Sequence, residues 1–243
     1  MATHGHGHLS RPIPVQHWTG LEGLAPLNQV QIVPVDQDGL WKFVVGDYMH
    51  NVLFYLEEVC PISCAICLGA ANRSFQMSMS QPMYGVVMVF ERPVRLQGGL
   101  KGCFCCCLGQ NMEIEGPPGR RIASISEDCN IWGTSLTIRD AKGVAALKVI
   151  GPTLPPYICC TNEAVFQVLT MAGTSVGVIR TNGRAIVSFP VNLDVYLKGC
   201  LIACSVLISY MFSKETCTFD FFCWCYYMLA PGAVSNYLDE HDT

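Results

Sequence analysis

Cysteine is the residue type in this chain with the most obvious chemistry, and several of its fifteen cysteines are clustered. The densest cluster is formed by Cys103, Cys105, Cys106 and Cys107, among glycines and close to Lys101. Thiols in a small-residue loop beside a cation and apolar side chains suit S-acylation. Several acyl chains hold a protein at a membrane far more firmly than one chain does. Buried or unreactive thiols are the alternative that the spacing leaves open.

A metal site is the second chemistry that cysteines can support. Cys64 and Cys67 form a C-x-x-C pair, and Cys60 stands just before them. The second pair would have to come from residues 103–107, where the thiols are crowded for a tetrahedral zinc site. The first twenty residues contain no apolar run of signal-peptide length, so we expect a reducing compartment without structural disulfides. Structural zinc is the weaker interpretation of these spacings.

A possible serine nucleophile occurs in the segment Gly173–Gly177, which matches the pattern G-x-S-x-G around Ser175. Asp194 and His241 follow in the order found in α/β hydrolases. That chemistry requires a strand before the serine and a helix after it. Here the residues after Ser175 have a strand pattern, so a chance match is the better interpretation. We expect no hydrolase activity and no catalytic residue.

Composition narrows the class of protein. The chain has 243 residues, of which 51% are hydrophobic and 14% are charged, with a net charge of −4. A disordered chain needs low hydrophobicity and high charge. A nucleic-acid binder that relies on bulk charge needs a cationic excess. The composition excludes a disordered chain and argues against such a nucleic-acid binder, and the low charge favours a membrane-associated protein.

The elements that must position these residues are mostly strands. Glu57 and Glu58 follow one of them, and since neighbours in a strand point to opposite faces, a solvated edge is the preferred interpretation of this pair. Short β-rich runs bounded by turn residues recur along the chain and predict an all-β barrel or sandwich. The predicted strands cover residues 30–35, 40–45, 51–56, 84–90, 130–138, 145–150, 164–171, 175–180 and 185–189.

One apolar helix is predicted near the C-terminus. Its uncharged stretch, residues 199–213, has fifteen residues, whereas a membrane-spanning helix needs about twenty. Adding 195–197 lengthens the helix but places Lys198 inside it, where it could snorkel near an end. The segment is therefore either a buried core helix or a short membrane span. Its apolar positions include Gly199, Cys200, Leu201, Ile202, Val206, Leu207 and Ile208.

Several ordered stretches together resemble the phospholipid scramblases, and they cover about residues 18–213. The stretches are Trp18–Leu24, Phe90–Pro93, the cysteine run 103–107, Met112–Gly119, Gly151–Pro152 followed by Cys159–Cys160, and Phe189–Val195. The resemblance implies a mainly β fold, an antiparallel tubby-like β-barrel that encloses a hydrophobic C-terminal helix. It divides the chain into a flexible tail over 1–17, a scramblase-like domain over 18–213 with its helix at about 195–213, and a divergent tail over 214–243.

The same resemblance implies a function. Scramblases move phospholipids in both directions between bilayer leaflets without ATP, so the expected partners are membrane phospholipids and not nucleic acids, and the protein is not an enzyme. Palmitate is expected on Cys103, Cys105, Cys106 and Cys107, and the expected location is the cytoplasmic face of the plasma membrane. The alternative is a lipid-anchored tubby-like adaptor or signalling protein without transport activity.

The calcium-binding segment of the family is degenerate in this chain. Aligned on Phe189 and Pro190, the family's acidic positions fall on Thr181, Gly183 and Asn192, and no Asp or Glu occurs from 164 to 193. Calcium takes six to eight oxygen ligands, several of them charged. Asn192 and Asp194 remain as candidate ligands and alone would bind calcium very weakly. Calcium is therefore a cofactor expected from the family but doubtful for this chain.

Overall fold

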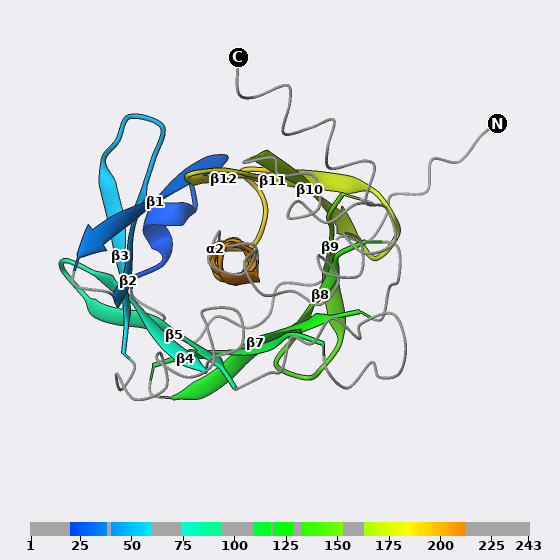
Figure 1. Cartoon of the computed structure of the whole chain (residues 1–243), viewed down its shortest axis with the longest axis horizontal. Helices are drawn as coiled ribbons and strands as arrows, with labels where there is room; N and C mark the ends of the chain where they lie inside the picture. Colours follow the sequence, from blue (N-terminus) through cyan, green and yellow to red (C-terminus); the bar gives the residue numbers. More distant parts are fainter. Residues whose placement is uncertain are drawn as a thin grey trace, which may run out of the picture.

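The computed structural model describes residues 20–37, 40–59, 74–93, 109–117, 119–128, 133–152 and 163–211. Within these residues the chain forms a closed antiparallel barrel of twelve strands that surrounds one α-helix (Figure 1). The predicted mainly β architecture, a barrel that encloses a hydrophobic C-terminal helix, is confirmed. A short 3-10 helix, η1 (Glu22–Leu24), precedes the barrel.

The strands follow one another around the barrel in chain order, and β1 closes it by pairing with β12. Closure joins Val30 to Val187 and Ile32 to Ala185. The strands are β1 (Gln29–Gln37), β2 (Leu40–Gly46), β3 (Val52–Glu58), β4 (Phe75–Gln81), β5 (Gly85–Arg92), β6 (Asn111–Gly116), β7 (Arg120–Glu127), β8 (Ser135–Asp140), β9 (Ala145–Ile150), β10 (Glu163–Thr170), β11 (Ser175–Asn182) and β12 (Ala185–Ser188).

Strand alternation builds the core. In β3, Phe54 and Leu56 are completely buried, whereas Tyr55 between them is exposed. The same period of two recurs in β6, where Met112 and Ile114 are buried. Side chains alone fill an eight-stranded barrel, but twelve strands leave room for a further element. That element is α2 (Val195–Met211), and one hydrophobic cluster joins it to the barrel wall.

The helix runs along the barrel from one mouth to the other. It begins after β12 beside η1 and the start of β1, and we call this opening the first mouth. The connections β2–β3, β4–β5, β6–β7, β8–β9 and β10–β11 lie at the first mouth because antiparallel strands alternate in direction. The opposite opening, where α2 ends beside the end of β3, is the second mouth.

The structure decides between the two alternatives for the helix. Thirteen of its seventeen residues are buried inside the barrel, including all seven apolar positions named above. The helix therefore fills the barrel. None of the described helices combines the length and the apolar character that a bilayer crossing demands.

Three strands were absent from the sequence prediction, namely β4, β6 and β7. The strand expected at 130–138 begins later, at Ser135, and residues 129–132 lie outside the described part of the chain. The bounds of the other expected strands agree with the observed bounds to within two residues.

Candidate functional site: the helix and its two polar ends

Lys198 fixes the beginning of α2 at the first mouth. Its ammonium group is buried, and its three N–H donors are shared among the backbone carbonyl oxygens of Leu24, Ala25, Leu27 and Val191, at N···O distances of 2.9 to 3.0 Å. Three of these carbonyls belong to the segment that contains and follows η1. The lysine thereby ties the chain before β1 to the helix after β12.

The surroundings of Lys198 match the needs of a buried cation. Burial lowers the pKa of Lys198, while the nearby carboxylate of Asp194 raises it. A desolvated charge is costly unless hydrogen bonds replace the lost water. The carbonyl oxygens provide this replacement, and the Phe189 ring lies 5.1 Å from the ammonium nitrogen, within the range of a cation–π contact. Sequence analysis placed Lys198 near a helix end but missed this cage of carbonyls.

The two candidate calcium ligands lie just before α2. The Asp194 carboxylate caps the helix, since its Oδ1 accepts the backbone N–H of Tyr196 at 2.9 Å and that of Leu197 at 3.4 Å. Asn192 is exposed two residues earlier. Among the described residues, no three His, Cys, Asp or Glu side chains come together in a way that could hold a metal ion. Calcium binding at Asn192 and Asp194 stays a prediction.

Tyr210 fixes the other end of α2 at the second mouth. Its hydroxyl donates to Oε2 of Glu58 at 3.1 Å, and its ring stacks on Phe75 with centroids 4.1 Å apart. The guanidinium of Arg92 lies 5.6 Å from the centre of the same Phe75 ring and donates to Oε1 of Gln110 through Nε at 2.9 Å. Arg92 has no exposed surface. These contacts join α2 to the ends of β3, β4 and β5.

Glu58 corrects one sequence interpretation. The Glu57–Glu58 pair was expected to form a solvated edge, but only Glu57 is exposed, while Glu58 is 5% exposed and faces the barrel interior. Strand alternation contained the signal, because Glu58 shares its face with the buried Phe54 and Leu56.

The middle of α2 packs closely against the wall. A Cβ atom placed on Gly199 would lie 2.7 Å from Sδ of Met88 in β5, so only glycine allows this approach without a shift. Cys200 and Cys204 are free and buried. Burial raises the pKa of the Cys200 thiol to about 12 and that of Cys204 still further. Neither thiol is suited to nucleophilic or redox chemistry in the folded protein.

The other thirteen cysteines, Cys103, Cys105, Cys106 and Cys107 among them, lie outside the described residues. They fall in the connections β3–β4, β5–β6, β7–β8 and β9–β10 and in the chain after α2. Because the strands alternate in direction, each of these segments is joined to the described barrel at the second mouth. The sequence showed clusters of cysteines, and the topology shows that their attachment points share one end of the molecule.

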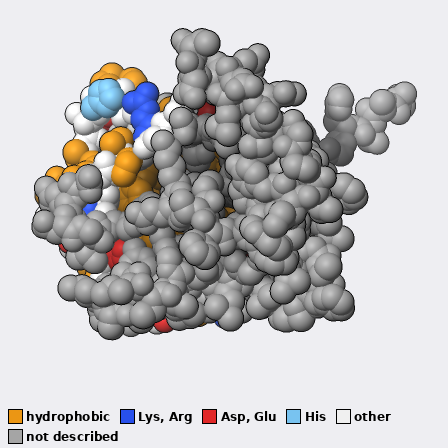
Figure 2. Space-filling model, viewed as in Figure 1, with side chains coloured by type: hydrophobic (Ala, Val, Ile, Leu, Met, Phe, Trp, Pro, Cys, Tyr) orange, Lys and Arg blue, Asp and Glu red, His pale blue; other side chains and the backbone are white. Residues whose placement is uncertain are grey.

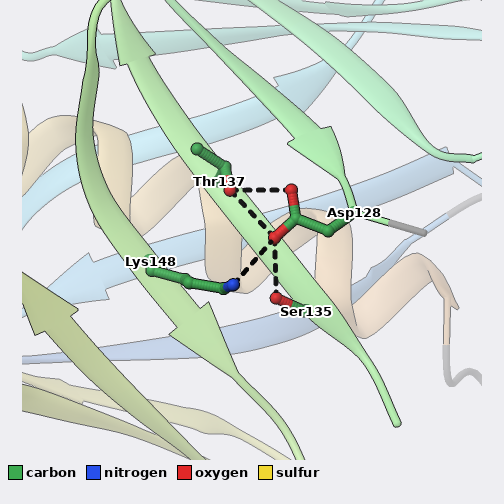
Figure 3. Close-up of polar contacts among 4 residues, drawn as sticks. All are labelled: Asp128, Ser135, Thr137 and Lys148. Carbon is green, nitrogen blue, oxygen red and sulfur yellow. Dashed lines mark hydrogen bonds and ion pairs between the residues drawn. The ribbon is translucent and has the colours of Figure 1, made fainter. Parts of the chain in front are cut away.

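A polar cluster on β8 and its neighbours has the residue types of a reactive site (Figure 3). The Asp128 carboxylate accepts hydrogen bonds from Ser135 at 2.8 Å and from Thr137 at 2.8 and 2.9 Å, and it lies 3.5 Å from the Lys148 ammonium nitrogen. The carboxylate oxygens are engaged by these donors, and the hydroxyl groups of Ser135 and Thr137 hold the carboxylate in place. The cluster therefore links three strands, and we assign it a structural role.

The G-x-S-x-G segment, interpreted above as a chance match, does not form a nucleophile elbow in the described part of the chain. Ser175 is the first residue of β11, directly after a turn, so it lacks the strand-to-helix corner of a nucleophile elbow. Asp194 is occupied as a helix cap, and His241 lies outside the described residues.

Comparison with known proteins gives a consistent result. The family model described as Scramblase matches residues 40–215, which is most of the chain. Phospholipid scramblase 1 of Mus musculus is 27% identical over 84% of this chain and 67% of its own length. Phospholipid scramblase 1 of Homo sapiens is 28% identical over 72% of this chain and 57% of its own length.

The comparisons also include one further scramblase and one solved structure. Phospholipid scramblase family member 5 of Homo sapiens is 24% identical over 86% of this chain and 84% of its own length. Among solved structures, a protein from Arabidopsis thaliana is 12% identical with a TM-score of 0.44, covering 79% of this chain and 98% of that one. The chain spans about two thirds or less of the length of the scramblase 1 relatives that it matches.

Proposed function

Because this chain belongs to the scramblase family, we propose that it is a membrane-associated protein that moves phospholipids in both directions between bilayer leaflets without ATP. The observation that carries this proposal is the family match, which extends from β2 to the end of α2. The relatives named phospholipid scramblases support phospholipids as the substrate class. Lipid translocation makes and breaks no covalent bond, so the proposal assigns no catalytic residue.

The burial of α2 inside the barrel limits the routes by which lipids could move. Residues from both the wall and α2 fill the barrel interior and form a single core. Withdrawing α2 would separate Lys198 from its carbonyl cage and Tyr210 from Glu58. Exposing these buried groups to hydrocarbon is costly. We therefore propose that the barrel acts with α2 in place, by perturbing the bilayer from outside the barrel.

Acylation is proposed to hold the protein at the cytoplasmic face of the plasma membrane. Palmitate on Cys103, Cys105, Cys106 and Cys107 would supply several chains, which anchor more stably than one. The test is to change all four cysteines to serine and to measure membrane partitioning in cells. Unchanged partitioning of this variant would remove the anchoring proposal.

Calcium is proposed to be dispensable. The only carboxylate of the candidate site, Asp194, serves as a helix cap, and a cap with one exposed amide beside it offers far fewer than the six to eight oxygens that calcium takes. Lipid movement by this chain should therefore be the same with and without calcium.

Reconstitution tests the proposed function directly. The purified full chain is placed in liposomes that contain fluorescent phospholipids, and a membrane-impermeant quencher reports how fast inner-leaflet lipid becomes accessible. Acceleration over protein-free liposomes in both the presence and absence of calcium is expected. Acceleration of lipid exchange only in the presence of calcium would mean that the chain binds calcium through residues outside 164–193.

A lipid-anchored adaptor is the second candidate, and the burial of α2 inside the barrel favours it. Reconstituted protein that keeps its fold but leaves lipid accessibility unchanged would select this candidate over transport.

A further inference from the structure

The eight methionines that the structure describes fall into two groups. Met49, Met83 and Met171 have 64%, 84% and 55% of their surface exposed. The other five are at most 1% exposed and lie in the barrel interior, namely Met77, Met79, Met88, Met112 and Met211. Peroxides oxidise the sulfur of methionine to a sulfoxide. An oxidant in solution reaches the first group directly, and it reaches the second group only when the barrel opens.

The three exposed methionines lie in hairpin connections at the first mouth. Met49 belongs to the β2–β3 connection, Met83 to the β4–β5 connection and Met171 to the β10–β11 connection. Figure 2 shows the β2–β3 connection at the surface, marked by the pale blue side chain of His50, which is the sole histidine among the described residues. The three sulfur atoms are therefore separate sites, each in a turn of its own.

Hydrogen bonds that do not involve sulfur hold the first two of these turns. The backbone N–H of Met49 donates to Oδ1 of Asp47 at 2.8 Å. In the turn that contains Met83, the backbone N–H of Tyr84 donates to the carbonyl oxygen of Gln81 at 3.2 Å. Both methionines are thus presented on ordered turns.

The turn that contains Met171 is built in the same way. The backbone N–H of Gly173 donates to the carbonyl oxygen of Thr170 at 2.9 Å, and the backbone N–H of Thr170 donates to that of Thr174 at 2.8 Å. Oxidation adds one oxygen to a side chain that already projects into water. We therefore expect the hydrogen bonds that hold all three turns to survive it.

The buried methionines differ in accessibility and in the consequence of oxidation. Met88 is completely buried, and its Sδ lies so close to α2 that a Cβ placed on Gly199 would be 2.7 Å away. A sulfoxide oxygen in this apolar core would be a polar group without water, which is costly. Oxidation of the core is therefore slow in the folded protein and destabilises it when it occurs.

We propose that Met49, Met83 and Met171 are sites of reversible oxidation by peroxides at the first mouth. The sulfur lone pair attacks one peroxide oxygen, and the S–O bond forms as the O–O bond breaks. The departing hydroxide takes the proton of the transferred oxygen and leaves as water. The sulfur loses two electrons and hydrogen peroxide gains them. Each reaction converts an apolar side chain at this mouth into a polar one.

Reversal needs a thiol reductant and a methionine sulfoxide reductase, of which there is one class for each sulfoxide epimer. Overall, the sulfoxide and two thiols give the thioether, one disulfide and water. A reductase has to take the side chain into its own active site. The exposed turns at Met49, Met83 and Met171 permit this without unfolding of the barrel.

Peptide mass mapping of the full chain treated with hydrogen peroxide tests the sites. N-acetylmethionine amide in the same solution gives the rate of an unprotected thioether, and the mass of one added oxygen is followed at each methionine. The three exposed methionines should react within about fivefold of the free reference, and the five buried ones at least about tenfold more slowly than the exposed ones. A slower reaction at any exposed site, or a smaller difference between the groups, would overturn the proposal.

A triple variant assigns the rapid reaction to these positions. Leucine has nearly the volume of methionine, so Met49→Leu, Met83→Leu and Met171→Leu together should leave the fold intact. This variant should lose all rapid oxidation of methionine in the described part of the chain. Met77→Leu, at a buried position in β4, is the matched control and should keep the rapid reaction. Rapid oxidation at a buried methionine of the triple variant would contradict the assignment.

Unfolding in urea and enzymatic reduction test whether oxidation at the first mouth is reversible. Wild-type protein oxidised only at the three exposed sites should keep its unfolding midpoint, relative to the triple leucine variant treated in the same way, which corrects for oxidation of cysteines. Both classes of methionine sulfoxide reductase with dithiothreitol should then restore the original mass of the three peptides. A lowered midpoint, or sulfoxides that resist both enzymes, would contradict reversible sites.

Discussion

The hydroxyl of Tyr210 in α2 donates a hydrogen bond to the carboxylate of Glu58 in β3, 152 residues earlier, at 3.1 Å inside the barrel. Together with Lys198 at the other mouth, this contact secures the helix at both of its ends. The apolar middle of α2 supplies most of the buried surface, and the polar ends determine its position along the barrel axis. An apolar helix alone could slide, because hydrophobic burial has little directionality.

Changing Tyr210 to phenylalanine should destabilise the protein by about 1–3 kcal/mol, because a buried carboxylate loses a hydrogen-bond donor. The ring and its stacking on Phe75 are retained, so the loss reports the hydroxyl alone. Urea unfolding measures the change. Tyr84→Phe removes a hydroxyl from an exposed tyrosine and should be nearly neutral. Equal effects of the two variants would show that the bond to Glu58 adds no stability.

Changing Lys198 to methionine should cost about 2–5 kcal/mol, because it leaves buried carbonyl oxygens without their donor. Lys142→Met is the matched control, since Lys142 is exposed in a turn at the same mouth. The free energy of unfolding of both variants is measured by denaturant titration. A cost for Lys198→Met no larger than that of the control would mean that the cage contributes nothing to stability.

Cys200 and Cys204 should react with thiol reagents only as fast as the protein opens, because both are buried and burial raises the pKa of each thiol. Mass mapping of alkylated peptides over time measures this protection. Rapid labelling of the intact fold at neutral pH would show that α2 leaves the barrel.

The same thiols predict a pH dependence of stability. In the unfolded chain they ionise near the ordinary value of 9.0, but in the fold Cys200 ionises only at about 12. The folded state therefore binds more protons between these values, and stability should fall as pH rises through this window, by up to about 1.4 kcal/mol per pH unit for each thiol. Unfolding titrations across the window should show a shallower slope for Cys200→Ala than for the wild type. An unchanged slope would contradict the assignment to Cys200.

Changing Gly199 to valine should destabilise the protein by about 1–3 kcal/mol, because the new side chain meets Met88 in a packed core. Met88→Ala should recover part of this loss, which a double-mutant cycle on the unfolding free energies would reveal. Gly23→Ala is the control, since an added Cβ there meets no atom within 4 Å. If the losses of unfolding free energy from Gly199→Val and Met88→Ala simply add, the side chains at positions 199 and 88 are not in contact.

Substitutions at Asp194 distinguish between its role as a helix cap and a role as a calcium ligand. Asp194→Ala should cost about 1 kcal/mol, whereas Asp194→Asn should retain most of the stability because asparagine also caps helices well. Both values should be the same with calcium and with a chelator. A calcium-dependent difference between the wild type and Asp194→Asn would instead identify the carboxylate as a metal ligand.

The barrel and its helix could be predicted because most strands are rich in β-branched residues and end at clear turns, as in β1 and β5. The missed strands lack that signal. Methionine and serine alternate in β4, glutamate recurs in β6, and β7 contains small polar residues. In each of these strands the residues that face the barrel interior include apolar ones. Only the closed barrel, however, shows that these residues belong to the core.

The site was less predictable than the fold. Glu58 was interpreted as part of a solvated edge and Lys198 as a snorkelling residue near a helix end, because a charge in a sequence is normally solvated. Their partners are a backbone segment about 170 residues earlier in one case and a helix about 150 residues later in the other. Sequence spacing contains no information on such distant pairs. The attachment of the cysteine segments to one mouth likewise follows from strand order, which no local pattern reveals.

The pairing of β1 with β12 also bears on how the protein is made. While the ribosome is still adding residues before Ala185, the strand Gln29–Gln37 has one unsatisfied edge, and the cavity for α2 has no occupant until residues 195–211 have emerged. Such non-local closure is slow and leaves strand edges open to other chains. The nascent polypeptide therefore has an open strand edge and an unfilled barrel until residues 185–211 have been added, and we expect chaperones to protect it from aggregation during that interval.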